Sequence, residues 1–104
     1  MKNKGFNIFG KIFGKVQGVG YREWARKKAN HLKLKGWIKN CQDLTVEFEV
    51  NGKKKDVKAF IKECYKGPLL SRVDKIDFQK KNLSDNQEGF VIKYKRNFFF
   101  WDIQ

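Results

Sequence analysis

The sequence predicts an α+β fold in which two helices cover one face of an antiparallel sheet. Three observations support this prediction. Apolar and polar residues alternate over residues 44–50, which is the pattern of a half-buried strand. Apolar residues recur at helical spacing over residues 22–33 and 57–65, which indicates two amphipathic helices. The 104 residues are 40% hydrophobic, which suits one domain with a single core.

The first half of the chain moves from strand to helix and back to strand. Residues 6–13 are rich in Phe and Ile and are expected to form a strand, and the glycines of residues 14–20 indicate a loop before the first helix. Residues 36–40 are expected to form a short strand. Residues 40–43 have the composition of a turn, so this strand and the alternating strand after it should form a hairpin.

The second half repeats the helix-to-strand order. Gly67-Pro68 should stop the second helix, with Gly67 as a left-handed cap and Pro68 barring continuation. Residues 72–80 are expected to form a strand with a bulge, because Val73 and Ile76 stand three residues apart and break strict alternation. Apolar residues alternate again over residues 90–94. The whole order is βαββαβ plus a short extra strand, which predicts a ferredoxin-like α/β sandwich.

The charge of the chain favours anionic ligands. Lys and Arg number 24 against 11 Asp and Glu, giving a net charge of +13. Such a field attracts nucleic acid, anionic lipid or a phosphorylated small molecule, although a lysine-rich proteome would give the same excess. Cys41 and Cys64 lack zinc spacing and are expected to be free thiols, and no metal site is expected. Neither a signal peptide nor a membrane span is predicted, so a cytoplasmic location is expected.

The chemistry of the chain is concentrated in residues 14–22, Gly-Lys-Val-Gln-Gly-Val-Gly-Tyr-Arg. Gly18 and Gly20 accept positive φ, so the loop can turn several backbone N–H groups inward. The helix that follows adds unpaired N–H groups and the positive end of its dipole. Arg22 offers a planar fork that can grip two oxygens of a phosphate. Together these features predict an anion cradle.

This loop resembles the signature of the acylphosphatase family, G-x-V-Q-G-V-x-F-R, with Tyr21 in place of Phe. Gly36-Trp37-Ile38-Lys39-Asn40 is similar to the family's G-W-V-x-N, which ends on its catalytic asparagine. The resemblance covers roughly residues 8 to 95 and includes further short matches, at Asp43, 45–47, Gly67-Pro68, Arg72-Val73 and Gly89-Phe90. It implies an acylphosphatase-like domain over residues 1–95, and residues 96–104 would be an aromatic C-terminal extension of the same domain.

The resemblance also implies an activity and its residues. The chain would be a metal-independent acyl phosphate hydrolase without a cofactor, cleaving a small acyl phosphate to a carboxylate and inorganic phosphate, and acting as a monomer. Arg22 would hold the phosphate and Asn40 would position the attacking water. Substrate would also be bound by the loop residues Gln17, Gly18, Val19, Gly20 and Tyr21. Neither a specific nucleic acid nor a membrane is expected as a partner.

The chain departs from the family pattern in three places: at Leu44, at Lys33, and in a tail, residues 95–104, that overruns the usual end. Leu44 stands where the family often has Gly, and if its turn needs positive φ this costs roughly 1 kcal/mol or more. Lys33 stands where Gly often ends the first helix, with a similar cost if the left-handed cap is kept. Tyr21 in place of Phe is expected to be a conservative packing change, and its hydroxyl would need a hydrogen-bond partner if it is buried. The aromatic tail is expected to fold back over the sheet or a sheet edge, rather than to form a partner surface.

Other functions remain open from the residues alone. The RNA-recognition fold has the same element order and suits the positive charge, so a nucleic-acid-binding module is the main alternative. However, residues 88–94 lack the basic residue that precedes Gly in its aromatic sheet motif. A catalytically inactive scaffold that interacts through the tail is a third reading. His31 as a catalytic base is disfavoured, because a histidine on a helix surface is the ordinary case and the family's scheme uses none. Cys41 as a nucleophile is disfavoured, because no histidine or cationic partner is evident.

Overall fold

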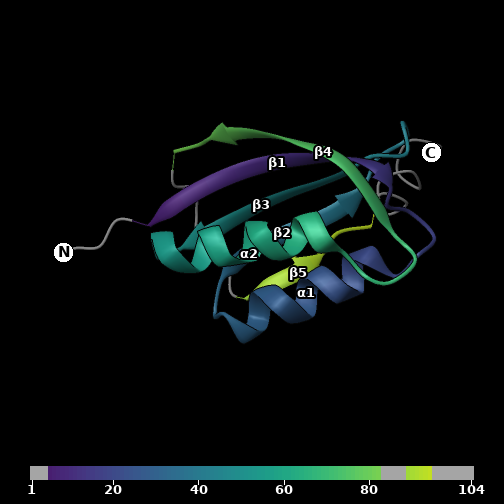
Figure 1. The fold of residues 1–104 in the computed structure, drawn as a ribbon. Coiled ribbons are helices and arrows are strands. Elements are labelled where there is room, and N and C mark those ends of the chain that lie inside the picture. Colours follow the sequence, from purple (N-terminus) through teal and green to yellow (C-terminus); the bar gives the residue numbers. More distant parts are fainter. Residues whose placement is uncertain (1–4, 83–88, 95–104) are drawn as a thin grey trace, which may run out of the picture.

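The computed structural model describes residues 5–82 and 89–94 and contains one five-stranded sheet with two helices packed on one of its faces (Figure 1). This confirms the predicted ferredoxin-like α+β class. The elements are β1 (Phe6–Lys15), α1 (Tyr21–His31), β2 (Lys35–Asn40), β3 (Val46–Gly52), α2 (Lys54–Lys66), β4 (Arg72–Lys80) and β5 (Phe90–Ile92).

The strands lie in the order β4-β1-β3-β2-β5. Neighbours among the first four are antiparallel, but β2 and β5 are parallel, with Gly36 opposite Phe90 and Ile38 opposite Ile92. The sheet is therefore mixed, and the prediction of a fully antiparallel sheet was wrong for this outer pair. The chain reverses after β4, so β5 runs in the same direction as β1 and β2. It joins the sheet beside β2 instead of beside an oppositely directed strand.

Both helices bury one face against the sheet, and aromatic rings fill the space between the layers. Phe60 of α2 lies edge-on to Phe48 of β3 and tilted against Phe90 of β5, with ring centroids 5.5 Å apart in both pairs. Such offset ring contacts stabilise the core beyond the apolar area they bury. The three rings fix β5 against the layer of helices, and this positions the residues that follow it.

The predicted bulge is present in β4. The register with β1 shifts between Phe13 and Gly14, which lie opposite Lys75 and Val73. Asp74 of β4 therefore has no paired residue on β1. Gly67 has the expected positive φ of 67° and donates its N–H to Glu63 O, but its ψ of 175° lies outside the left-handed helical region. The C-terminal cap of α2 thus differs in kind from the predicted one.

Leu44 is not part of a strand, although the alternating pattern placed it in one. It lies in the turn between β2 and β3 with φ 72°, and 67% of its surface is exposed. The turn is closed by the N–H groups of Cys41 and Leu44, which donate to Thr45 O and Cys41 O. Lys33, which follows α1, has φ 60°. Both departures from the family's glycines therefore keep the backbone that favours glycine.

In the parts of the chain that the structure describes, no helix is long and apolar enough to cross a membrane. The predicted polar loop at residues 84–88 and the aromatic extension at residues 96–104 lie outside the described residues.

Candidate active site

The predicted anion cradle is the loop between β1 and α1, at one end of the sheet (Figure 1). Gly18 and Gly20 have φ 76° and 79°, which favours glycine over any L-residue. A Cβ at either position would meet no atom within 4 Å, so the backbone conformation, not crowding, explains these glycines. Gly20 O accepts the first helical hydrogen bond, from Trp24 N at 3.1 Å, so α1 begins directly at the loop.

The loop leaves its amides available. Within residues 5–82 and 89–94, no hydrogen bond is donated by the backbone N–H groups of residues 17–20. The first amides of α1 add further donors without partners inside the helix. Because these groups lie at a helix N-terminus, an anion bound by them would gain hydrogen bonds and a favourable dipole.

Tyr21 contributes its backbone to this loop, while its side chain belongs to the core. It is 1% exposed, and its hydroxyl donates to Cys64 O, which provides the partner that burial requires. Burial is also the main cause that raises the pKa of Tyr21 far above its ordinary value, so the phenol stays neutral. Only the amide of Tyr21 can therefore meet a ligand in this arrangement. The neighbouring Val19 packs its side chain against the core as well.

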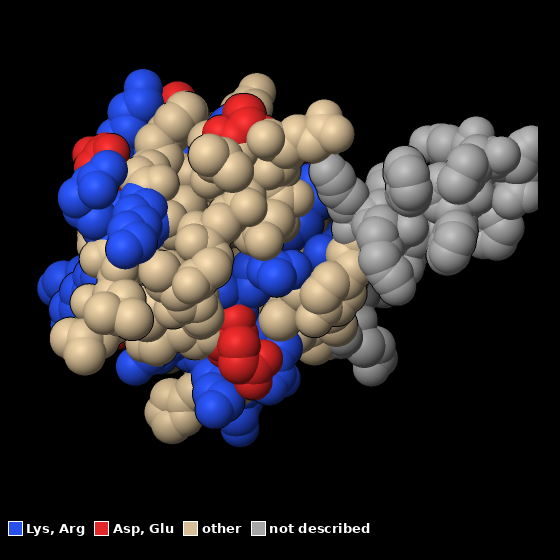
Figure 2. Space-filling model, turned by 90° about the vertical axis from the view of Figure 1, so that its right-hand side faces the viewer, with Lys and Arg blue, Asp and Glu red and all other residues tan. Residues whose placement is uncertain are grey.

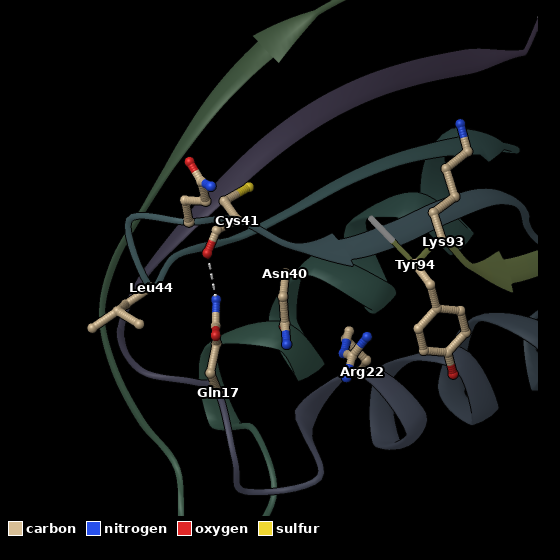
Figure 3. A pocket seen from close by; sticks show the side chains of 8 residues that line it. Gln17, Arg22, Asn40, Cys41, Leu44, Lys93 and Tyr94 are labelled. Atoms are coloured by element: carbon tan, nitrogen blue, oxygen red, sulfur yellow. Dashed lines mark hydrogen bonds between the residues drawn. The ribbon is translucent and has the colours of Figure 1, made fainter. Parts of the chain in front are cut away.

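Gln17 ties the loop to the turn between β2 and β3. Its Nε2 donates to Cys41 O and to Thr45 O, both at 2.9 Å. The first of these bonds is drawn in Figure 3. Since Asn40 is the last residue of β2 and directly precedes Cys41, the Gln17 amide fixes the loop and Asn40 relative to each other.

Arg22 and Asn40 face the same space from different elements. Arg22 lies in the first turn of α1, half-buried, with its guanidinium 5.2 Å from the centre of the Tyr94 ring. It forms no ion pair with any residue that the structure describes. The Asn40 amide nitrogen points into the space between Gln17 and Arg22 (Figure 3). Its buried Oδ1 has no hydrogen-bond partner in the described part of the chain.

Two adjoining cavities open at this point. The smaller, about 220 Å³, is lined by the loop and the start of α1. The larger, about 400 Å³, extends toward the β2–β3 turn, where Cys41, Gln42 and Leu44 line it, and toward Lys93. Both include Gln17, Arg22, Asn40 and Tyr94 in their walls. The catalytic and loop residues predicted from the sequence are thus brought together, with Val19 alone outside the two linings.

The charge around the site is predominantly positive. The end of the molecule that carries the loop displays more Lys and Arg surface than Asp and Glu surface (Figure 2). The Asp43 carboxylate, in the turn, already has partners within the protein. It accepts hydrogen bonds from the N–H and hydroxyl of Thr45 and lies 3.0 Å from the Lys11 ammonium. The hydrogen bonds from Thr45 and Lys11 lower the pKa of Asp43 to about 2. An anion approaching Arg22 therefore meets a turn whose carboxylate already has partners.

Sequence reasoning missed Tyr94 and Lys93 as parts of the site. The alternation over residues 90–94 placed Tyr94 on the apolar face of a strand, but β5 ends at Ile92 and Tyr94 is 53% exposed beside Arg22. His31 is at the far end of α1 from Arg22 and lines neither cavity. Cys41 lines the larger cavity, where burial raises the pKa of its thiol and disfavours the nucleophilic thiolate.

The fold and the site define a small α+β protein in which a glycine-bearing loop, an arginine and an asparagine line two adjoining cavities. Comparison with known proteins shows the family to which the chain belongs. The family model Acylphosphatase matches residues 8–92. An acylphosphatase of Clostridium acetobutylicum is 38% identical over 84 residues, which are 81% of this chain and 92% of that protein.

Solved structures agree with the sequence comparisons. The crystal structure of acylphosphatase from Bacillus subtilis superposes with a TM-score of 0.83 at 29% identity, covering 86% of this chain and 99% of that one. An acylphosphatase from Coxiella burnetii gives a TM-score of 0.80 at 30% identity, over 86% and 93% of the two chains. The chain belongs to the acylphosphatase family, whose enzymes hydrolyse acyl phosphates. These comparisons give no support to the nucleic-acid-binding alternative.

Proposed function

We propose that Arg22 and the amides of residues 17–22 bind the phosphoryl group of a small acyl phosphate, and that Asn40 positions the water that attacks it. The observation that carries this proposal is the position of the Arg22 guanidinium. It lies at the mouth of a loop with available amides, beside Asn40, and makes no ion pair within the described residues. An arginine with a purely structural role would be expected to donate its N–H groups to protein acceptors.

The reaction follows from the chemistry of a mixed anhydride. The water oxygen forms a bond to phosphorus as the bond between phosphorus and the acyl oxygen breaks, and the carboxylate leaves with the electron pair. Both protons of the water remain with the phosphate, so R–CO–OPO₃²⁻ and H₂O give R–COO⁻ and H₂PO₄⁻. The leaving group is already a good one, and the enzyme mainly positions the reactants and stabilises charge on the phosphoryl oxygens.

Each residue has a part that suits its chemistry. The planar guanidinium of Arg22 can grip two phosphoryl oxygens, and the loop amides can bind the remaining charge. Asn40 has an amide donor and an acceptor, so it can orient a water without accepting its proton. The substrate phosphate can accept that proton. We expect the reaction to proceed without a metal or cofactor, by a monomeric cytoplasmic enzyme.

Titration with inorganic phosphate tests this assignment. The wild type should bind phosphate, and phosphate should inhibit hydrolysis of acetyl phosphate competitively, with activity retained in excess EDTA. Lys28→Ala is the matched control, because Lys28 is a cation on the same helix that pairs with Glu63 at 3.6 Å, and neither residue lines a cavity. Loss of phosphate binding in Arg22→Ala but not in Lys28→Ala supports the role of Arg22. Equal binding by both variants contradicts it.

A further inference from the structure

Leu44 is unsuited to its position in two independent ways. Its φ of 72° lies where glycine is favoured and an L-residue is strained. Its side chain is 67% exposed, so burial in the core does not account for a leucine either. Lys33 shares the positive φ, but it is a charged residue on an exposed position, as a surface turn allows. A strained backbone that packing does not explain points to a role at a site.

The position of Leu44 suits a contact with the acyl group of the substrate. The phosphoryl group is assigned to the smaller cavity, which the loop amides line. The acyl group must then extend out of the loop, and the larger cavity adjoins it through Arg22 and Asn40. Leu44 stands on the outer edge of this larger cavity, on the opposite side from Tyr94 (Figure 3). Each added carbon extends the acyl group farther from the phosphate, so a longer alkyl chain comes nearer to that edge than a short acyl group does.

We propose that Leu44 is a specificity residue, and that this enzyme favours acyl phosphates whose acyl group carries an apolar chain of several carbons over acetyl phosphate. The inference rests on the proposed function, because it assumes that the phosphate end is held at Arg22. The physical basis is removal of apolar surface from water on both partners: the alkyl chain covers Leu44, which is otherwise exposed. No charged group is needed for this preference.

The test compares two substrates with leaving groups of similar acidity, acetyl phosphate and hexanoyl phosphate. Their intrinsic reactivities are close, so the ratio of their kcat/KM values reports contacts with the alkyl chain. In Leu44→Gly, kcat/KM for hexanoyl phosphate should fall roughly threefold to tenfold, while that for acetyl phosphate stays within about twofold. Leu44→Asn, which tolerates positive φ but is polar, should behave in the same way.

Lys33→Gly is the matched control, because it relieves the same kind of backbone strain away from both cavities. Both glycine variants should raise Tm by roughly 2 to 6 °C, but only the change at Leu44 should alter the substrate ratio. An active wild type whose ratio is unchanged in Leu44→Gly overturns the role of Leu44 alone. A wild type inactive on both substrates overturns this inference together with the proposed function.

Discussion

The guanidinium of Arg22 lies over the ring of Tyr94, with its central carbon 5.2 Å from the ring centre. The contact joins the first turn of α1 to the segment that follows β5, two parts of the chain that are distant in sequence. A ring face attracts the cation without using any of its N–H donors, so the planar fork stays available for phosphate.

Removal of this ring should weaken substrate binding more than turnover. Because an exposed cation–π contact contributes about 0.5 to 1 kcal/mol, Tyr94→Leu should raise KM for acetyl phosphate about two- to fivefold with little change in kcat. Tyr94→Phe keeps the ring and should restore the wild-type KM. Steady-state kinetics of the two variants make the comparison, and an equal rise in KM for Phe and Leu would exclude the ring as the cause.

Arg22 itself should be far more sensitive. Arg22→Ala removes the proposed phosphate ligand and should lower kcat/KM by roughly 10² to 10³, with loss of inhibition by phosphate. Arg22→Lys should recover little of this, because a point charge cannot reproduce the two-pronged grip. Near-normal kcat/KM in the alanine variant would remove Arg22 from the mechanism.

Asn40→Ala should separate binding from chemistry. If Asn40 positions the water, kcat should fall by roughly 10² or more while the inhibition constant for phosphate changes by less than about threefold. Inhibition by phosphate at steady state, measured beside turnover, provides both values. An unchanged kcat with lost phosphate inhibition would assign Asn40 to phosphate binding instead.

Tyr21→Phe should lower the free energy of unfolding and leave catalytic activity unchanged. The hydroxyl is buried and donates to Cys64 O, and its loss leaves that carbonyl without this donor. The free energy of unfolding should fall by about 1 kcal/mol, while kcat/KM for acetyl phosphate is retained. Urea unfolding and kinetics check the two halves of this prediction. A large loss of activity would show that the phenol does more than hold α1 to α2.

The turn between β2 and β3 should weaken in acid. The pKa of Asp43 is lowered to about 2 by hydrogen bonds from Thr45 and Lys11, so its ionised form is favoured in the folded state. Its contribution to stability is therefore fully present above the unfolded pKa of about 3.9 and is lost as pH falls toward 2. Urea unfolding of wild type and Asp43→Asn should show a difference in unfolding free energy that is constant near neutrality and shrinks below about pH 4. A difference that persists undiminished down to pH 2 would contradict this.

Local patterns predicted most of the fold. Alternation and helical spacing gave the order of the elements, and the three-residue gap between Val73 and Ile76 predicted the bulge that β4 shows opposite Phe13 and Gly14. The positive φ of Leu44 and Lys33 followed from comparison with a family pattern that has glycine there. These features depend on neighbouring residues, and a sequence expresses such relationships directly.

Long-range relationships were not predictable in the same way. Alternation over residues 90–94 indicated a strand but carried no information on its partner, so the parallel pairing of β5 with β2 was missed. The contact of Tyr94 with Arg22 depends on that pairing, because it places the end of β5 beside the first turn of α1. The two hydrogen bonds from Gln17 to the β2–β3 turn are also long-range, because their acceptors, Cys41 and Thr45, follow Gln17 by 24 and 28 positions in the sequence.

The bulge in β4 has a consequence for how molecules of this protein meet one another. β4 is an outer strand of nine residues, long enough to act as a template for pairing with a second sheet. The unpaired residue interrupts the regular ladder of hydrogen-bonding groups, and Lys75 and Asp77 place charges along the strand. At the opposite edge β5 has only three residues. Both borders of the sheet are thus poor templates for intermolecular strand addition.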